Sequence, residues 1–485
     1  MSQINENVIR DVVNDVLGQL GDAPAAKSDG CGCKSSSPRN PGKRGVFATA
    51  GQAAQAAAGA FEQLKQAGFA GREKVVQIVK TLCADNAVAW GHIELEETKI
   101  GLIDHKIAKL TGIPGIPGTE WITPVGMSGD NGITMEEFTP FGVIGAITPV
   151  THSIPTIAAN VINMVAAGNT IVFNAHPGGA RCAAMAVDAF NEAIESELGI
   201  ANIVTIVEQP TLESFNDICA DENIALLCVT GGPGVVAAAM QSGKRAICAG
   251  PGNPPVVIAE SARLDKAAAD VLFGGGFDAN LLCIGEKQVF VVDKVYREFM
   301  AALEAAGGVK LNPQQLKRLT SDAFTFTKDA GGCSHPAVNR ELVGADCVTL
   351  AKRCGAKAPE GTEMLFAETD EDHLFVIEEQ MMPVLPIVRV KDFDEAVAKA
   401  KVSEHGYKHS SMIHTLNVEE MTAMAQAMDS TLFVKNGSCL TGLGSGGEGY
   451  GSFSVATTTG EGITTPMTFT RKRRCVMVDN LNIFG

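Results

Sequence analysis

Apolar residues recur through the middle of the chain in short continuous runs that alternate with longer amphipathic stretches. The runs at 143–147, 170–173, 203–207 and 224–229 are almost entirely apolar, and stretches between them, such as 180–198, repeat apolar residues at helical spacing. Strands that are apolar on both faces are typical of a parallel sheet covered by helices. The alternation therefore predicts an α/β fold built from βαβ units.

A second alternation of strands and helices runs from 264 to about 436, so the chain holds more than one α/β unit. Residues 119–139 are rich in β-forming residues around a Gly-Asp-Asn-Gly turn at 129–132, which predicts a hairpin. The predicted organisation is a helix at 1–20, a linker at 21–45, a domain at 46–256 with the hairpin as an arm, a domain at 257–450, and a strand-like C-terminal segment at 451–485.

The N-terminal helix is predicted from a stripe of aliphatic residues. They repeat on one helical face, at Ile4, Val8, Ile9, Val12, Val13, Val16, Leu17 and Leu20. Residues 21–45 are rich in Gly, Ser, Pro and Lys, which predicts a flexible linker. An amphipathic helix on such a linker is typical of a peptide that docks on a partner. The alternative is that it folds back onto its own domain.

Composition narrows the class of protein. The 485 residues carry a net charge of −16, which disfavours binding to nucleic acid or to an anionic membrane surface. The basic run at 471–474 is then better explained as a solvated strand edge. Thirteen cysteines without a secretory signal indicate free thiols in a reducing compartment, and no apolar run approaches the ~18 residues of a membrane span. Cys31 and Cys33 lack further ligands at zinc spacing, so no metal site is predicted.

One cysteine stands in an unusual loop. Residues 274–287 begin with three glycines and place Cys283 between Leu281, Leu282 and Ile284. Glycines let a backbone pass close to other atoms or adopt φ values that other residues avoid. A nucleophilic thiol needs a partly exposed, electropositive environment, whereas an apolar collar is typical of a buried structural cysteine. The loop by itself leaves both interpretations open.

A glycine-rich turn joins a predicted strand to a helix. Thr230, Gly231 and Gly232 follow the strand, and the helix opens at Val235. Backbone N–H groups at a helix N-terminus bind anions such as a pyrophosphate. A GxGxxG sequence at 442–447 lies outside the βαβ series, so we do not expect it to bind a dinucleotide.

Several motifs occur in a specific order along the chain. They are Pro140–Gly145, Val229–Gly234, Gly250–Pro255, Phe277–Cys283, Glu379–Pro386, Val434–Gly437 and Gly446–Gly449. Together they resemble the aldehyde dehydrogenase superfamily, specifically its CoA-acylating branch of the propionaldehyde dehydrogenase type found in bacterial microcompartments. The resemblance covers residues 45–485 and implies an α/β fold with a Rossmann-like nucleotide-binding domain, an α/β catalytic domain with the cysteine, and a β arm for oligomerisation.

The resemblance also implies a reaction. Cys283 matches the family nucleophile, whose thiolate adds to an aldehyde, gives up hydride to NAD and keeps the acyl group as a thioester for CoA. Hydrolytic relatives carry a glutamate base in the segment that matches 250–255, and no acid is present here. The implied activity is CoA-dependent oxidation of a short-chain aldehyde such as propanal. A hydrolytic enzyme and an inactive cargo or scaffold protein are the alternatives.

The matched motifs assign residues to the site. Those implied to bind the cofactors are Thr148, Pro149, His176, Pro177, Thr230, Gly231, Gly232, Val235, Gly250, Glu379 and Pro383. Leu281, Leu282 and Ile284 would form the substrate pocket. Many relatives place an oxyanion-binding asparagine where this chain has His152. His152 would therefore either donate an N–H to the oxyanion as a catalytic residue or act as a spacer.

The implied partners are the aldehyde, CoA and further proteins. Residues 1–20 would bind a microcompartment shell or cargo protein, which would place the enzyme in a microcompartment lumen within the bacterial cytoplasm. A homo-oligomer, dimeric or tetrameric, is expected because the C-terminal segment is strand-like and ends in apolar residues. The sequence leaves the choice of aldehyde, and of NAD or NADP, open.

Overall fold

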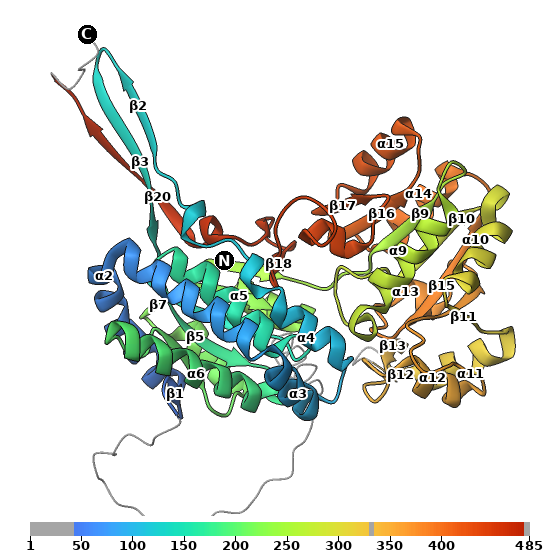
Figure 1. The fold of residues 1–485 in the computed structure, drawn as a ribbon, viewed down its shortest axis with the longest axis horizontal. Coiled ribbons are helices and arrows are strands. Elements are labelled where there is room, and N and C mark those ends of the chain that lie inside the picture. Colours follow the sequence, from blue (N-terminus) through green and yellow to red (C-terminus); the bar gives the residue numbers. More distant parts are fainter. Residues whose placement is uncertain (1–42, 329–333, 480–485) are drawn as a thin grey trace, which may run out of the picture. The chain divides into compact units, whose positions relative to one another are not determined.

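The structure is a computed structural model that describes residues 43–328 and 334–479. The predicted helix at 1–20 and nearly all of the predicted linker lie outside the described residues. The chain forms two compact units, each made of segments that are separate in the sequence. Figure 1 colours the chain from the N-terminus to the C-terminus. Among the described residues, the first unit holds 43–85, 117–247 and 465–479, and the second holds 86–116, 248–328 and 334–464.

The first unit is built on a six-stranded sheet in the order β1-β6-β5-β4-β7-β8. Its strands are β1 Val46–Phe47, β4 Val143–Thr148, β5 Thr170–Ala175, β6 Val204–Val207, β7 Ile224–Thr230 and β8 Ala246–Ala249. The ladders from β1 through β7 are parallel, as the continuous apolar runs predict. The helices are α2 Ala50–Asp85, α5 Ser153–Ala166, α6 Ala180–Leu198, α7 Leu212–Ala220 and α8 Pro233–Gln241.

Local sequence determines whether these helices are buried and where they begin and end. Every residue of α5 is buried, because the helix is apolar on nearly all sides. The helix α6 ends at Gly199, whose φ of 68° is the left-handed conformation that glycine adopts at little cost. Thr211 and Ser214 exchange side-chain and backbone hydrogen bonds in a capping box that begins α7.

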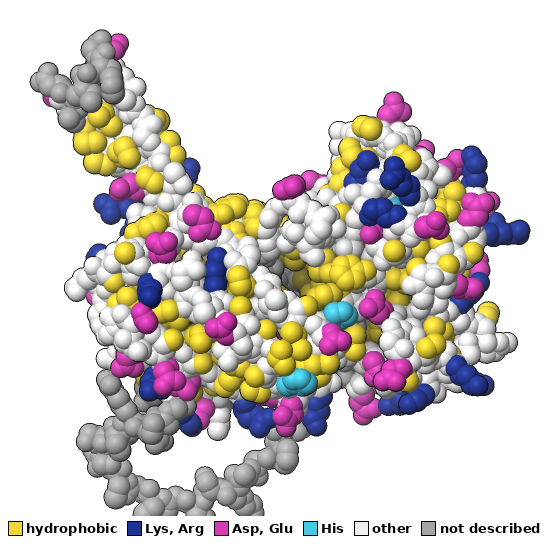
Figure 2. Space-filling view, in the orientation of Figure 1, with side chains coloured by type: hydrophobic (Ala, Val, Ile, Leu, Met, Phe, Trp, Pro, Cys, Tyr) yellow, Lys and Arg dark blue, Asp and Glu magenta, His cyan; other side chains and the backbone are white. Residues whose placement is uncertain are grey.

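The predicted hairpin is present and belongs to a three-stranded antiparallel sheet. The strands β2 Val125–Gly129 and β3 Gly132–Pro140 pair with each other, and β3 pairs with β20 Thr470–Met477. Figure 1 shows this sheet extending from the first unit as a long arm. Figure 2 shows apolar side chains gathered on this arm. Among the residues of its strands, Val125, Met127 and Val476 are 49%, 45% and 59% exposed.

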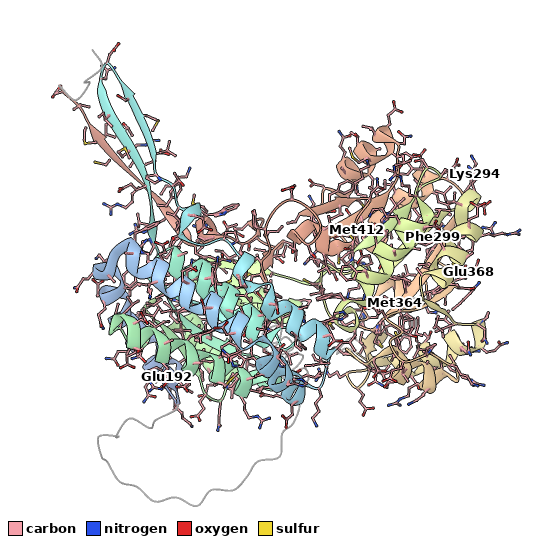
Figure 3. The ribbon with its side chains drawn as sticks, in the orientation of Figure 1. Glu192, Lys294, Phe299, Met364, Glu368 and Met412 are labelled. Carbon is pink, nitrogen blue, oxygen red and sulfur yellow. The ribbon has the colours of Figure 1, made fainter. Side chains whose placement is uncertain are left out.

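The second unit is built on a seven-stranded parallel sheet in the order β11-β14-β15-β10-β9-β16-β17. Its strands are β9 Pro255–Ile258, β10 Gln288–Val292, β11 Val309–Lys310, β14 Leu365–Thr369, β15 Val384–Val390, β16 Ser410–His414 and β17 Leu432–Lys435. Its helices are α3 Ala87–Thr98, α4 Ile103–Thr111, α9 Leu264–Gly276, α10 Asp293–Ala305, α11 Pro313–Ala323, α12 Cys347–Cys354, α13 Leu374–Ile377, α14 Phe393–Ser403 and α15 Val418–Met428. Two short antiparallel pairs complete it, β12 Phe324–Lys328 with β13 Ser334–Val338 and β18 Val455–Ala456 with β19 Gly462–Ile463. Phe299, Met364 and Met412, labelled in Figure 3, lie in its core.

The units divide the chain differently from the predicted domains. Residues 86–116 fall inside the predicted domain 46–256 but pack with the second unit, because α3 and α4 pack together and α4 meets the short 3₁₀ helix η4 Phe277–Asn280. Residues 451–464 also belong to the second unit, while 465–479 return to the first as β20 and the turn before it. Contacts between segments far apart in sequence decide these memberships, and composition does not reveal them. Within the described ranges, no helix has the length and apolarity to cross a membrane.

Candidate active site

The first sheet brings several predicted cofactor-binding residues to one edge. The chain passes from β4 to β5 and β6 on one side of β4 and then returns to β7 on the other side. Ligands of open parallel sheets bind at the carboxyl ends of strands where the order reverses in this way. Thr148 ends β4, His176 follows β5 and Thr230 ends β7, and the N–H of His176 donates to the carbonyl of Thr148 at 3.0 Å. The structure thus places these residues on neighbouring strand ends.

A helix N-terminus lies at the same edge. Gly232 is the N-cap of α8, and Gly231, Gly232 and Val235 are half-buried or exposed. The N–H groups of the first helical turn have no intrahelical acceptor, so they are available to an anion. The hydroxyl of Thr148 is buried and has no hydrogen-bond partner among the described residues. A buried hydroxyl without a partner and open N–H groups suit a polar ligand such as a dinucleotide.

The two histidines of this edge differ in environment. His176 is half-buried, and its Nδ1 accepts a hydrogen bond from the N–H of Gly178 at 3.0 Å, next to the exposed Pro177. His152 is buried at the N-cap position of α5 and does not cap the helix with its side chain. Its backbone carbonyl accepts from the N–H of Thr156 at 2.9 Å. The side chain of His152 is therefore not required for starting the helix.

In the second unit, Cys283 follows a turn with three consecutive residues in the left-handed region. Asp278, Ala279 and Asn280 have φ values of 50°, 55° and 65°. The Asn280 side chain donates to the carbonyls of Gly275 at 2.7 Å and Glu286 at 3.0 Å. These bonds join the turn to both sides of the segment that contains the cysteine.

The three glycines before the turn are explained by close packing. A Cβ at Gly274 would collide with the carboxylate of Glu286, and one at Gly276 would lie 2.9 Å from the carbonyl of Glu363. At Gly275 it would lie 2.9 Å from the end of Met364. None of the three has a positive φ, so close approach, rather than left-handed backbone, is the reason for these glycines.

Cys283 is half-buried and has charged residues near it. Burial, and to a smaller extent the carboxylate of Glu379, raise the pKa of the Cys283 thiol to about 12, although the ammonium of Lys287 acts to lower it. Lys287 is buried and donates to both the carbonyl and the side-chain oxygen of Asn280 at 2.7 Å. Without a ligand the thiol is therefore protonated near neutral pH, so a positive charge supplied by a ligand would promote thiolate formation.

Gly252 connects Cys283 with two further groups. A Cβ on Gly252 would lie 2.6 Å from the carbonyl oxygen of Cys283 and 2.8 Å from the ring of His409. The N–H of Gly252 also donates to Glu379, the predicted ribose-binding residue, whose pKa is nevertheless raised by burial. The predicted nucleophile, Cys283, and the predicted ribose-binding residue, Glu379, therefore both lie next to Gly252.

Sequence reasoning assigned no role to His409. This histidine is buried just before β16, and burial lowers its pKa to about 4, so the ring is neutral. Its Nδ1 lies 2.8 Å from the hydroxyl of Ser410, and its Nε2 has no hydrogen-bond partner among the described residues. The sequence around β16 gives no indication that the histidine preceding this strand lies next to the nucleophile loop.

Other predicted residues lie in the packed interior. Leu282 and Ile284 belong to the hydrophobic core of the second unit, and Leu281 is 2% exposed. Pro383 is buried, and its carbonyl accepts from the N–H of Leu365 at 2.9 Å. Gly250 is half-buried, and a Cβ there would meet the hydroxyl of Thr458 at 2.5 Å. Contact of these residues with a substrate or cofactor stays a prediction. In the part of the chain that the structure describes, no group of His, Cys, Asp and Glu side chains has the arrangement of a metal site.

Comparison with known proteins provides independent evidence. Residues 44–448 match the aldehyde dehydrogenase family. The chain is 38% identical to acetaldehyde dehydrogenase (acetylating) EutE of Salmonella typhimurium, covering 99% of this chain and 100% of that protein. It is 35% identical to propanal dehydrogenase (CoA-propanoylating) of the same organism, covering 92% and 95%.

Solved structures are similar over nearly the whole described chain. The propionaldehyde dehydrogenase from the Clostridium phytofermentans fucose utilisation bacterial microcompartment is 42% identical with a TM-score of 0.87, covering 91% of this chain and 100% of that one. The Rhodopseudomonas palustris propionaldehyde dehydrogenase with bound propionyl-CoA is 38% identical with a TM-score of 0.87, covering 93% and 99%.

Proposed function

Because this chain belongs to the aldehyde dehydrogenase family, we propose that it oxidises a short-chain aldehyde, such as propanal or acetaldehyde, to the acyl-CoA with NAD and CoA. The observation that supports this most directly is the Cys283 loop, in which a half-buried thiol follows a rigid turn beside Glu379 and Lys287. The two relatives named above, which cover 99% and 92% of this chain, are named as acetylating and propanoylating enzymes.

In the proposed reaction, Cys283 carries out the chemistry and other residues bind the cofactor. NAD, when bound, supplies a hydride acceptor and a positive charge. Cys283 Sγ forms a bond to the aldehyde carbon and loses its proton, and loss of hydride from that carbon leaves a thioester on the sulfur. The strand edge with Thr148 and the α8 N-terminus would hold the pyrophosphate, and Glu379 would hold the ribose. A related structure, 38% identical, is described with bound CoA and an acylated cysteine.

Acyl transfer to CoA is favoured over hydrolysis by what surrounds the thioester. The segment 250–255 contains no acid that could activate water, whereas a thiol such as that of CoA needs little activation. The ring of His409 lies beside the Cys283 loop with Nε2 unpartnered among the described residues, but its lowered pKa makes it a weak base, so we assign it no part in taking the thiol proton. CoA attack on the carbonyl carbon then releases acyl-CoA and returns the Cys283 thiolate.

The deciding experiment measures NADH formation from propanal with and without CoA. We expect turnover that requires CoA and ends in propanoyl-CoA, identified by mass spectrometry. Cys283→Ala should bind NAD normally and form no NADH beyond background, because the covalent nucleophile is missing. CoA-independent production of propanoate would indicate a hydrolytic enzyme, and absence of any turnover would indicate a cargo or scaffold protein.

We also propose that residues 1–20 direct the enzyme into a bacterial microcompartment. Support comes from their one-sided aliphatic stripe and from the microcompartment origin of a 42% identical relative. Each buried Val or Ile contributes roughly 1.5–3 kcal/mol before ordering costs, so a partner can bind the free helix. Residues 1–44 fused to a fluorescent protein should enter shells, and Val12→Asp with Val16→Asp should prevent entry. Loss of activity on deleting 1–44 would show instead that the helix belongs to the folded enzyme.

The exposed arm supports a homo-oligomer, dimeric or tetrameric. Val125, Met127 and Val476 expose about half of their surface on a sheet with free strand edges, which favours pairing with a second copy. Light scattering should give at least twice the 50.7 kDa mass of one chain. Replacing both Met127 and Val476 with Glu should shift that mass toward the monomer, and a monomeric wild-type protein would contradict the proposal.

A further inference from the structure

Four charged side chains are buried together next to the turn that precedes Cys283. Glu94, Lys106, Lys109 and Asp278 are between 0% and 4% exposed. Lys109 forms an ion pair and hydrogen bond with Asp278, and Lys106 lies 3.6 Å from Asp278 and 3.1 Å from Glu94. The cluster connects α3, α4 and η4 within the second unit.

Such a cluster is costly to bury, and hydrophobic residues would often stabilise a fold equally well. Burial lowers the pKa of Lys109 to about 8, opposed chiefly by the charge of Asp278. A buried charge pair that adds little net stability can still hold the backbone around it in one conformation.

The turn at Asp278 has a backbone that needs to be held. A left-handed φ is unfavourable for a non-glycine residue, and Ala279, at 55°, has no polar side chain to compensate. Asp278 is held from three further directions: its Oδ1 accepts from the N–H of Leu102 at 2.8 Å, its own N–H donates to Nδ1 of His105 at 2.8 Å, and Gly101 packs against its carboxylate. The residues of α4 and the turn before it therefore surround Asp278.

The turn conformation is transmitted to the cysteine through Asn280. Its side chain bonds the carbonyls of Gly275 and Glu286, and Lys287 bonds its carbonyl and side-chain oxygens. Rotation of the turn would break these four bonds together, and they enclose the segment that contains Cys283. The orientation of Cys283 thus depends on the conformation of residues 278–280.

We propose that Lys109 is a positioning residue for the nucleophile, because its ion pair with Asp278 holds the left-handed turn that aims Cys283 at the aldehyde. This assignment rests on the proposed function, in which Cys283 forms the thioester. Lys109 touches neither substrate nor cofactor in this role and acts only through Asp278 and the turn.

The test compares three variants of the full chain by stopped-flow measurement of the NADH burst from propanal without CoA, which reports acylation of Cys283. Lys109→Met removes the ion pair with a side chain of similar length. Asp278→Asn removes the charge and keeps a residue that tolerates the left-handed region. Lys399→Met is the control, because Lys399 is also ion-paired, with Glu395 at 2.9 Å and Glu371 at 3.1 Å, but lies on α14.

We expect the acylation rate to fall at least tenfold for Lys109→Met and Asp278→Asn, with NAD affinity unchanged and Lys399→Met at the wild-type rate. The double variant should be no slower than the slower single one, because both changes break the same pair. The rate at which iodoacetamide alkylates Cys283, measured by mass spectrometry, should differ from the wild-type rate in the same two variants. Circular dichroism at the assay temperature confirms folding, and Asp278→Asn decides the matter if Lys109→Met does not fold.

Acylation within twofold of wild type in a folded variant would overturn the positioning role. So would a loss of rate that disappears when the rate is divided by the folded fraction, since that result assigns the pair to stability alone. Wild-type protein without CoA-dependent turnover would instead refute the proposed function, which separates the two failures.

Discussion

The carboxyl edge of the first sheet presents backbone N–H groups, hydroxyls and histidines, whereas the Cys283 loop of the second unit is held by buried charges and close backbone approaches. At the first edge, Thr148, Thr230 and the glycines before α8 present hydroxyls and peptide groups. In the loop, Lys287, Glu286 and Asp278 are all fully buried. Both regions adjoin parallel sheets, so they differ in the residues that surround the strand ends and not in the type of sheet.

The comparison explains what each region can do. Backbone donors at a helix N-terminus are present whatever side chains the helix carries, so a site made of them binds a diphosphate but tolerates substitution. A reactive thiol needs one orientation, and a geometry error of about 1 Å can cost roughly 10²-fold in rate. Buried charge pairs and glycine contacts supply that orientation at the cost of sensitivity to single changes. Substitutions should therefore be severe in the loop and mild at the α8 N-terminus, where backbone N–H groups would bind the cofactor.

Apart from loss of the nucleophile itself, the largest effect is expected for Gly252→Ala. The new methyl group would lie 2.6 Å from the carbonyl of Cys283 and 2.8 Å from the ring of His409, so the loop must move. We expect kcat to fall about 10²-fold or more, and the free energy of unfolding to fall by about 1–3 kcal/mol. Steady-state kinetics with propanal, NAD and CoA and a thermal melt measure the two effects.

Gly115→Ala is the matched control in the same unit, because a Cβ there meets nothing within 4 Å and its φ is not positive. It should leave kcat unchanged. If Gly252→Ala kept wild-type kcat, the loop would tolerate displacement, and the contrast between the two regions would be wrong.

The sequence predicts the framework of both regions more fully than their chemistry. Apolar runs predicted the parallel strands, because the burial of a strand shows in its own residues. The resemblance placed Cys283 and Glu379 in the family fold, because the motifs that contain them can be read directly from the sequence. The contact of Lys109 with Asp278 joins residues far apart in the chain, and nothing in either segment indicates it. His409 was missed for the same reason, and the role of the glycines at 274–276 became clear only from their neighbours Glu286 and Glu363.

An intermediate effect is expected for His152, the departure from the family asparagine. If its side chain donates to the oxyanion, His152→Ala should lower kcat about 10²-fold, the usual loss for one such donor, with little change in NAD affinity. His152→Asn should keep most of the activity, since an amide N–H can take the same position. Equal kcat for wild type and the alanine variant would show that backbone N–H groups stabilise the oxyanion and that His152 is a spacer.

The smallest effect is expected at the α8 N-terminus, where backbone rather than side chain should bind the cofactor. Val235 is half-buried, and the helical hydrogen bonds begin one position later, with the N–H of Val236 donating to the carbonyl of Gly232 at 3.2 Å. Val235→Ala keeps the N–H of residue 235, so the Kd for NAD should stay within about twofold of wild type. Val235→Pro removes that N–H, and proline is tolerated in the first turn of a helix. Loss of one donor to a charged phosphate costs about 1.4 kcal/mol or more, so the Kd should rise about tenfold while the melting temperature changes little. Isothermal titration of both variants measures the difference. A weaker Kd for the alanine variant than for the proline variant would mean that the Val235 side chain binds the cofactor, and that the first sheet, like the Cys283 loop, depends on its side chains.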